Sequence, residues 1–191
     1  MAEVETLHEA LIDELKDLYN AEKQLTRALP KLAKNATNRE LKSALTSHLR
    51  ETQGQVRRLE QAMRLLDETP KGKLCDGMQG IIKEGNKMLE EVTDGPVMDA
   101  VIIAGAQRAE HYEIGAYGVC IAWSNAMGHT KVARLLTQTL NEEKAADKKL
   151  SGLAEGGINQ SAADAAHPEE DKEPVAAISD GRKRSPKAGR R

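Results

Sequence analysis

Glutamate residues interrupt leucine-rich stripes at two places in this sequence. Between residues 11 and 29 a leucine recurs at every third or fourth position, and the only break in the series is Glu22. Between residues 136 and 150 a similar apolar series has Glu143 at its centre, and Asp147 follows one helical turn later. This spacing predicts amphipathic helices. Each carboxylate would therefore lie on or near a face that points into the protein.

A third apolar stripe continues through polar residues of other kinds. Between residues 45 and 59 it runs through His48, Thr52 and Gln55. Glu51 lies about one turn after His48, beside the same face. Imidazole is a common ligand of iron, and carboxylate oxygen suits manganese. This stripe therefore also carries groups that are compatible with a metal ion.

A fourth stripe carries two glutamates, Glu110 and Glu113, in the sequence EHYE. Residues three apart share one face of a helix, so one of these carboxylates could bridge two ions while the other binds one of them. Tyr117 lies one turn after Glu113. There it is a candidate catalytic residue that passes an electron or buffers a radical.

Carboxylates that converge from four helices would require positive charge. An unpaired buried carboxylate costs several kcal/mol, and neighbouring carboxylates repel one another. Two divalent ions would offset this charge, and oxygen ligands with a histidine are typical of iron or manganese. We therefore predict two iron ions, or alternatively two manganese ions. The predicted metal ligands are Glu22, His48, Glu51, Glu110, Glu113, Glu143 and Asp147.

Each of these residues has a simpler interpretation when it is taken alone. A single glutamate in an apolar stripe often lies at the edge of the face and reaches solvent. His48 alone would suit a hydrogen-bonded core histidine, Gln55 an ordinary polar group between helices, and Tyr117 ordinary core packing. The metal interpretation depends on a coincidence, because all four segments are interrupted at a similar depth by metal-compatible groups.

Four long helices must position these groups. The hydrophobic periodicity predicts them over residues 4–35, 38–67, 96–127 and 130–153. Very short links join the first helix to the second and the third to the fourth, which is typical of antiparallel hairpins. The link over residues 68–95 is long and contains a short helical pattern of its own. We therefore predict an all-α fold, a ferritin-like four-helix bundle of two hairpins joined by a long crossover.

The composition excludes several classes of function. Aromatic residues make up 2% of the 191 residues, with no Phe, which disfavours a sheet. A formal net charge of −2 gives no overall attraction to nucleic acid or anionic membranes. No apolar run is long enough to span a membrane, and the N-terminus lacks the features of a secretory signal. We expect a cytoplasmic protein with Cys75 and Cys120 as free thiols.

The predicted domains are a bundle over residues 1–154 and a disordered charged tail over 155–191. The tail is rich in Gly, Ala, Ser, Pro and charged residues and has no aromatic residue, so it buries too little apolar surface to fold. Its last segment, 179–191, carries six basic residues and one acidic residue. A weak contact with nucleic acid is one interpretation of that segment, and a solubilising tail is the simpler one.

Four segments also resemble a known family. They are DLYNAEKQLTRALPKLA, HLRETQGQVRRLEQ, AQRAEHYEIGAYG and TLNEEKAADKKLSGLA. They are similar to the YciE/YciF family of ferritin-like stress proteins, and the resemblance extends over about residues 4–153. It implies a ferritin-like fold that is commonly dimeric, a di-iron site and a role in stress responses.

By position, the resemblance implies the ligands Glu22, His48, Glu51, Glu110, Glu113 and Glu143. The site is similar to that of rubrerythrins, which also have two glutamates three apart on the third helix. It departs from the usual di-iron pattern of Glu-x-x-His on two helices, because Gly54 and Ala146 stand where the histidines would be. Asp147 would stand in on the fourth helix. The rubredoxin-like cysteine module is absent from this sequence, so electrons would need another source.

The leading hypothesis is a non-haem dinuclear carboxylate protein that reacts with peroxide or O₂, and a second is manganese catalase-like dismutation of peroxide. Two alternatives are not enzymes: a protein that binds metal for structure or storage, and a stress protein that protects DNA through its basic tail. The expected partners are a second copy of the chain and a small oxidant, with no membrane.

Overall fold

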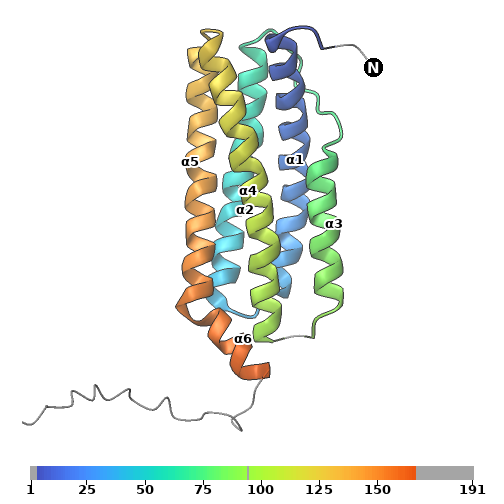
Figure 1. Ribbon diagram of the computed structural model, residues 1–191, viewed down its shortest axis with the longest axis vertical. Coiled ribbons are helices and arrows are strands. Elements are labelled where there is room, and N and C mark those ends of the chain that lie inside the picture. Colours follow the sequence, from blue (N-terminus) through green and yellow to red (C-terminus); the bar gives the residue numbers. More distant parts are fainter. Residues whose placement is uncertain (1–3, 94, 167–191) are drawn as a thin grey trace, which may run out of the picture.

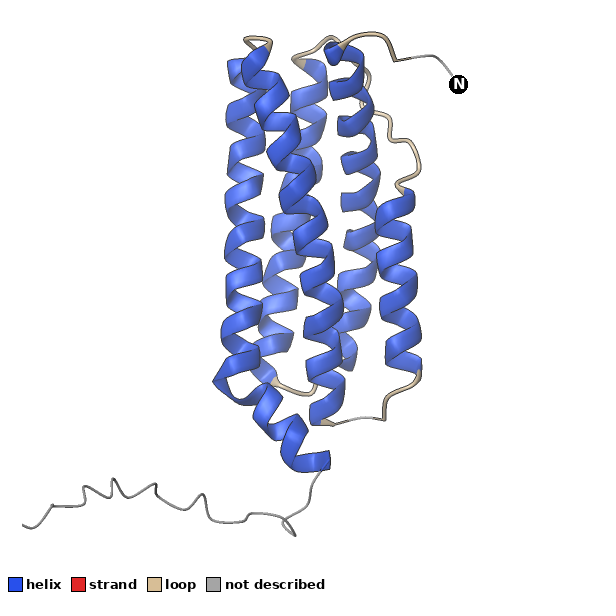
Figure 2. Cartoon of the chain, viewed as in Figure 1, coloured by secondary structure: helices blue, strands red, loops and turns tan. Residues whose placement is uncertain are grey.

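Helices form all of the regular structure in the computed structural model, which describes residues 4–93 and 95–166 (Figure 2). The four long ones are α1 (Leu7–Asn35), α2 (Arg39–Arg64), α4 (Pro96–Ala126) and α5 (Thr130–Leu153). The shorter ones are α3 (Asp76–Glu90), the π-helical turn η1 (Ala154–Ile158) and α6 (Asn159–Ala166). None of the helices in the described residues has an apolar stretch of the length needed to cross a bilayer.

The long helices form two antiparallel hairpins. Residues 36–38 join α1 to α2, and residues 127–129 join α4 to α5, so the members of each pair lie side by side. The chain passes from α2 to α4 through a long crossover that contains α3, and α3 packs on the outside of α1 and α4 (Figure 1). This connectivity confirms the predicted all-α, ferritin-like bundle.

Capping residues set the ends of the first two helices. Thr6 accepts a hydrogen bond from the backbone N–H of Glu9, whose side chain accepts one in return, so α1 begins at Leu7. Asn38 accepts hydrogen bonds from the N–H groups of Glu40 and Leu41, at 2.9 and 3.0 Å. The cap at Asn38 fixes where α2 begins, directly after the short link from α1.

Cys75 fastens the crossover to the bundle. Its N–H donates to Asn20 Oδ1 and its carbonyl oxygen accepts from Gln24 Nε2, both at 3.0 Å. Its Sγ lies 3.1 Å from the hydroxyl oxygen of Tyr112. Both cysteines are free, as expected, and both are buried. The N-terminus of α3 is thereby held against α1 and α4, where α3 covers an apolar side of the bundle.

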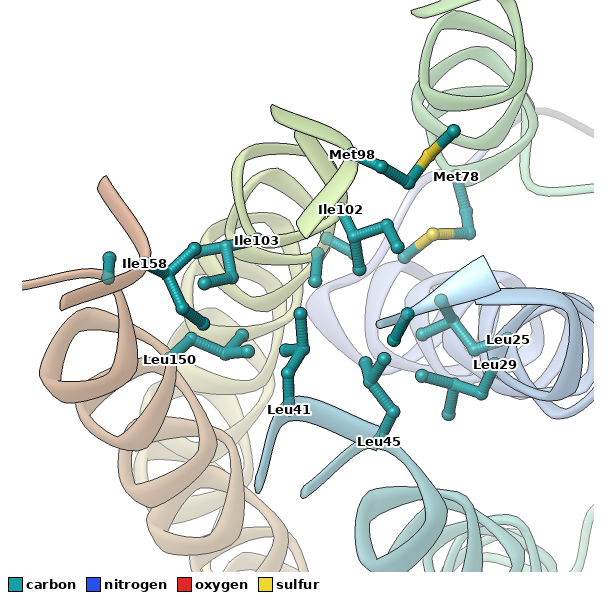
Figure 3. Packing of buried hydrophobic residues seen from close by; sticks show 14 of the residues in the cluster. Leu25, Leu29, Leu41, Leu45, Met78, Met98, Ile102, Ile103, Leu150 and Ile158 are labelled. Carbon is teal, nitrogen blue, oxygen red and sulfur yellow. The ribbon is translucent and has the colours of Figure 1, made fainter. Parts of the chain in front are cut away.

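The predicted disorder from residue 155 is wrong as far as Ala166, because η1 and α6 continue the helical structure there. Ile158 is buried and belongs to the same apolar cluster as Ile103 and Leu150 (Figure 3). Gly157 adopts φ 137°, which lets the chain turn back toward α4. One apolar residue in a polar stretch is too weak a signal to predict this contact. The remainder of the predicted tail, with the basic segment 179–191, lies outside the described residues.

Two apolar clusters form the core, one toward each end of the bundle. One includes Leu25, Leu29, Leu41, Leu45, Ile102, Ile103 and Leu150 (Figure 3). The other includes Leu11, Leu15, Leu18, Leu59, Met63, Tyr117, Cys120 and Leu136. On each long helix the buried residues between these two clusters are polar. The fold therefore places a polar layer at one height, enclosed by apolar side chains above and below.

Candidate metal centre

Four glutamates occupy the polar layer almost without solvent contact. Their exposed fractions lie between 0% and 2%, and they are Glu22 from α1, Glu110 and Glu113 from α4, and Glu143 from α5. The second helix, α2, contributes His48, which is also buried. The apolar stripes of the sequence thus predict correctly that these five side chains point inward.

His48 brings two of the glutamates to one point. Its Nε2 lies 3.2 Å from Glu110 Oε1 and 3.7 Å from Glu143 Oε2. One ligand atom from each of the three residues lies within 4.8 Å of the other two. One nitrogen and two carboxylate oxygens at this separation could hold a metal ion.

Several buried oxygens in the layer have no hydrogen-bond partner. Among the carboxylates they are Glu22 Oε2, Glu110 Oε2, Glu113 Oε1 and Glu143 Oε2. Leaving a buried polar atom unsatisfied costs about 1–3 kcal/mol, and more when the group is charged. Cations bound in this layer would satisfy these oxygens, so the residues fit a metal centre.

The environment of the glutamates opposes negative charge. Burial raises the pKa of Glu22 to about 8, although the hydrogen bond from Tyr117 acts in the other direction. Burial, with a hydrogen bond to Glu110, raises the pKa of Glu143 to about 10. Burial and the charges of its neighbours raise the pKa of Glu113 well above its ordinary value. Without a cation, this layer therefore holds protons at neutral pH.

His48 is held in its charged form by the carboxylates around it. Burial alone would lower its pKa, but its contacts with Glu110 and Glu51 raise the pKa to about 11. In the metal-free chain the imidazolium is thus the cation closest to Glu110. Binding of a metal ion at Nε2 would release this proton, because a ligating imidazole must be neutral.

Glu51 and Asp147 lie apart from the buried cluster. The side chain of Glu51 is 45% exposed, and its Oε2 lies 3.3 Å from Nδ1 of His48, the ring nitrogen that faces away from Glu110. The carboxylate of Asp147 accepts a hydrogen bond from Gln107 and lies 3.3 Å from Nε2 of the exposed His111. Asp147 is therefore bonded to side chains of α4 outside the layer.

Tyr117 closes the layer on the side of the second apolar cluster. Its hydroxyl donates to Glu22 Oε1 at 2.5 Å, and the side chain is fully buried. Burial and the charge of Glu22 raise the pKa of Tyr117 well above its ordinary value. The phenol is thus a proton donor fixed against one of the four glutamates.

Comparison with known proteins identifies the family of this chain. A family model described as Domain of unknown function (DUF892) matches residues 6–163. The chain belongs to this family. Protein YciF of Escherichia coli (strain K12) is 42% identical over 160 residues, which cover 83% of this chain and 96% of YciF. The resemblance to the YciE/YciF family is thereby confirmed.

Solved structures of other proteins share the architecture of this chain. The crystal structure of the E. coli stress protein YciF matches with a TM-score of 0.78 and 43% identity, over 82% of this chain and 99% of that one. YcfI from Rhodopseudomonas palustris matches with a TM-score of 0.77 and 48% identity, over 78% and 95% of the two chains. A protein from Xanthomonas campestris pv. campestris, at 20% identity and a TM-score of 0.66, shows the fold alone.

This DUF892 chain has a further polar network beside the cluster that sequence reasoning missed. Gln55 Nε2 donates to Glu143 Oε1 and, at 3.0 Å, to Glu142 Oε2. Arg58 pairs with both oxygens of Glu142, at 3.0 and 2.8 Å. The position of Gln55 in the same stripe as His48 was the available signal, but an amide between helices is common and does not by itself indicate a site.

A cavity of about 290 Å³ leads to the cluster between α2 and α5. Its walls are mostly apolar and include Ala44, Leu45, Ala146 and Leu150. His48, Glu51 and Glu110 also line it, together with Lys149. The cavity therefore reaches two of the three residues that could hold an ion, and it is large enough for a small molecule.

Proposed function

We propose that this chain carries a dinuclear carboxylate centre of two iron or two manganese ions and reacts with peroxide or O₂. The observation that supports this most directly is the set of four buried glutamates, each with an oxygen that lacks a partner. Two divalent ions would balance four carboxylates, whereas a single ion would leave excess negative charge in the core. This balance favours two ions over one.

The proposed ligands are Glu22, His48, Glu110, Glu113 and Glu143. Glu51 is assigned the role of a positioning residue, because it contacts the outer nitrogen of His48. A carboxylate there holds the ring orientation of a ligating histidine and raises its basicity. When bound, iron or manganese would supply electrons and Lewis acidity for cleavage of an O–O bond.

The surrounding residues support chemistry with a small oxidant. The apolar clusters above and below the layer keep water from the buried carboxylates. Tyr117 holds a proton at its hydroxyl, 2.5 Å from Glu22, where it is positioned to pass a proton or an electron to that side of the centre. The cavity at His48 offers a route that a peroxide molecule fits easily.

A role in stress responses and a homodimeric state are further parts of the proposal. The relative YciF is described as a stress protein, and removal of peroxide is a chemistry that such a role would use. The dimer is an expectation from the family resemblance, and sedimentation velocity of the full chain would test it.

The test is metal analysis of protein purified without chelator, combined with a peroxide assay. We expect about two equivalents of iron or manganese per chain, and loss of both in a Glu22→Leu, Glu110→Leu double variant. Asp147→Ala is the control, because that residue lies outside the cluster and should leave both ions bound. Fewer than two equivalents in the wild-type chain would contradict the proposal.

The peroxide assay then separates the candidate activities. Loss of peroxide with release of O₂ in manganese-loaded protein would indicate dismutation, which needs no reductant. Loss that depends on an added reductant would indicate a peroxidase. Two tightly bound ions with no reaction in either assay would indicate a metal-binding protein that is not an enzyme.

A further inference from the structure

The amide oxygen of Gln55 is a fifth buried oxygen in the layer without a partner. The Gln55 side chain has no exposed surface. Its nitrogen, by contrast, donates to carboxylate oxygens of both Glu143 and Glu142. The amide nitrogen therefore has two hydrogen-bond partners, whereas the amide oxygen is buried and has none.

The orientation of this amide follows from its neighbours. An amide nitrogen donates and an amide oxygen only accepts. If the group were flipped, its oxygen would face the carboxylate of Glu142, which is paired with Arg58 and offers no proton. The nitrogen must therefore face Glu142 and Glu143. The oxygen is bonded to the same carbon and so lies beside Glu143, on the helix face that also carries His48.

The available donors divide into two unlike groups. Around His48 they are one imidazole nitrogen with oxygens of Glu110 and Glu143. Outside these three residues, the unpartnered oxygens of the layer belong to Glu22, Glu113 and Gln55, and Glu110 and Glu143 each have one unpartnered oxygen as well. No second imidazole is available in the described residues, because His8 and His129 lie against each other, with ring centroids 5.6 Å apart, and His111 is exposed beside Asp147.

We propose that Gln55 is a neutral oxygen ligand and that the two ion positions of the centre are chemically unequal. One position has a nitrogen ligand, from His48. The other is formed from oxygen donors only, by Glu22, Glu113 and Gln55, and is the position at which Mn²⁺ competes best with nitrogen-seeking metals such as Zn²⁺. This inference rests on the proposed dinuclear centre.

Ligand chemistry and charge both support this assignment. Carboxylate and carbonyl oxygens suit manganese, whereas imidazole suits zinc and iron. A neutral amide adds an oxygen donor without adding a fifth negative charge to the four carboxylates. Its nitrogen also fixes Glu143, so the same side chain orients one ligand and serves as another.

The experiment uses Mn²⁺ and Zn²⁺ as probes, with the full chain freed of metal. The loss of the electron paramagnetic resonance signal of free Mn²⁺ measures its binding. The Mn²⁺ and Zn²⁺ bound per chain are then determined after the two metals have competed for the protein. We expect two Mn²⁺ per chain with unequal affinities. Gln55→Leu should weaken one of them by about tenfold or more and leave the other nearly unchanged.

Two further variants separate a ligand from a merely structural residue. Gln55→His keeps an N–H donor for Glu143 but replaces the oxygen with nitrogen, and it should shift one position from Mn²⁺ toward Zn²⁺. Thr52→Val is the control, since the Thr52 hydroxyl donates to the backbone of His48 in the same helix, and it should bind both ions as the wild-type chain does.

The outcomes that would overturn the inference are distinct from failure of the dinuclear centre itself. Two Mn²⁺ bound by Gln55→Leu with wild-type affinities would show that Gln55 is not a ligand, and the centre would stand without it. Weakening confined to the position that holds His48 and Glu143, the one that prefers Zn²⁺, would reduce Gln55 to a support for Glu143. Fewer than two ions in the wild-type chain would refute the centre, and this assignment with it.

Discussion

The exposed carboxylate of Glu51 lies 3.3 Å from Nδ1 of the buried His48, on the side of the ring opposite Glu110. This contact lowers the pKa of Glu51. With a proton on Nδ1 donated to Glu51, Nε2 presents its lone pair to the interior. The pair thus sets the tautomer that a metal ion in the polar layer would require.

Glu51→Ala should weaken metal binding without removing an ion. Loss of a carboxylate behind a ligating histidine reduces metal affinity by about 10–100-fold. Competition with a chelating dye would measure this change. The metal affinity of Glu51→Gln, which keeps an acceptor oxygen, should lie between that of Glu51→Ala and that of the wild-type chain. Loss of a whole equivalent of metal would instead make Glu51 a direct ligand, as the sequence predicts.

The stability of the metal-free chain should fall as the pH rises from 5 to 8. The pKa values of Glu22 and Glu143 are raised from an ordinary 4.5 to about 8 and about 10, so the folded chain binds protons that the unfolded chain has released. The contribution of these two groups to the free energy of unfolding is full below pH 4.5. It is lost as the pH rises through their pKa values in the folded chain. His48, raised from 6.5 to about 11, acts in the same direction.

Thermal unfolding at several pH values, with chelator present, would measure this effect. Each proton taken up by the folded chain contributes about 1.4 kcal/mol per pH unit within its window. Glu22→Gln should make the melting temperature fall less steeply with pH between pH 5 and 8, since it removes one of the groups that titrate there. A melting temperature that stays constant or rises over this interval would contradict the prediction.

Glu113→Leu should stabilise the metal-free chain and weaken metal binding. Glu113 is buried with an unpartnered oxygen, and an apolar side chain of similar volume would remove the cost of that unsatisfied oxygen, about 1–3 kcal/mol. Urea unfolding with and without Mn²⁺ would measure both effects. A variant that is less stable than the wild type without metal would indicate that Glu113 supports the fold rather than a metal site.

The positions of the buried glutamates follow from the sequence because helical periodicity is a local property. The breaks in the stripes at Glu22 and Glu143 show that each carboxylate lies on the apolar face of its helix. The short links determine which helices pair. The roles of Glu51 and Asp147 do not follow, because a rotation of less than half a turn decides between a core and a surface position. The partners of Gln55 and Arg58 depend on the contact between α2 and α5, and no local sequence pattern predicts that contact.

Tyr117→Phe should retain both ions but lose stability and react more slowly with peroxide. Removal of the hydroxyl leaves Glu22 Oε1 without its donor, at a cost of about 1–3 kcal/mol in the metal-free chain. Tyr19→Phe is a suitable control, because that hydroxyl donates to Glu60 at 3.0 Å outside the polar layer. Peroxide consumption by metal-loaded Tyr117→Phe at the wild-type rate would remove the tyrosine from the reaction.

Ala146→Phe should slow the entry of small molecules to the centre while the ligands remain in place. Ala146 lines the cavity of about 290 Å³ between α2 and α5, and a phenyl ring added there would occupy part of that space. Stopped-flow measurements of metal uptake and of the reaction with peroxide should both show slower rates, with two ions bound at equilibrium. The reduction should be larger for a bulky alkyl hydroperoxide than for hydrogen peroxide, because the larger molecule needs more of the cavity.

Ala122→Phe tests whether the effect belongs to the cavity. Ala122 is an exposed residue of α4 that does not line this cavity, so the same substitution there should leave both rates unchanged. Equal rates in Ala146→Phe and the wild-type chain would show that reactants reach the polar layer by another route. In that case the small apolar pocket between α1, α3 and α4, which also reaches Glu110, becomes the path to block, and Ala106→Phe would narrow it.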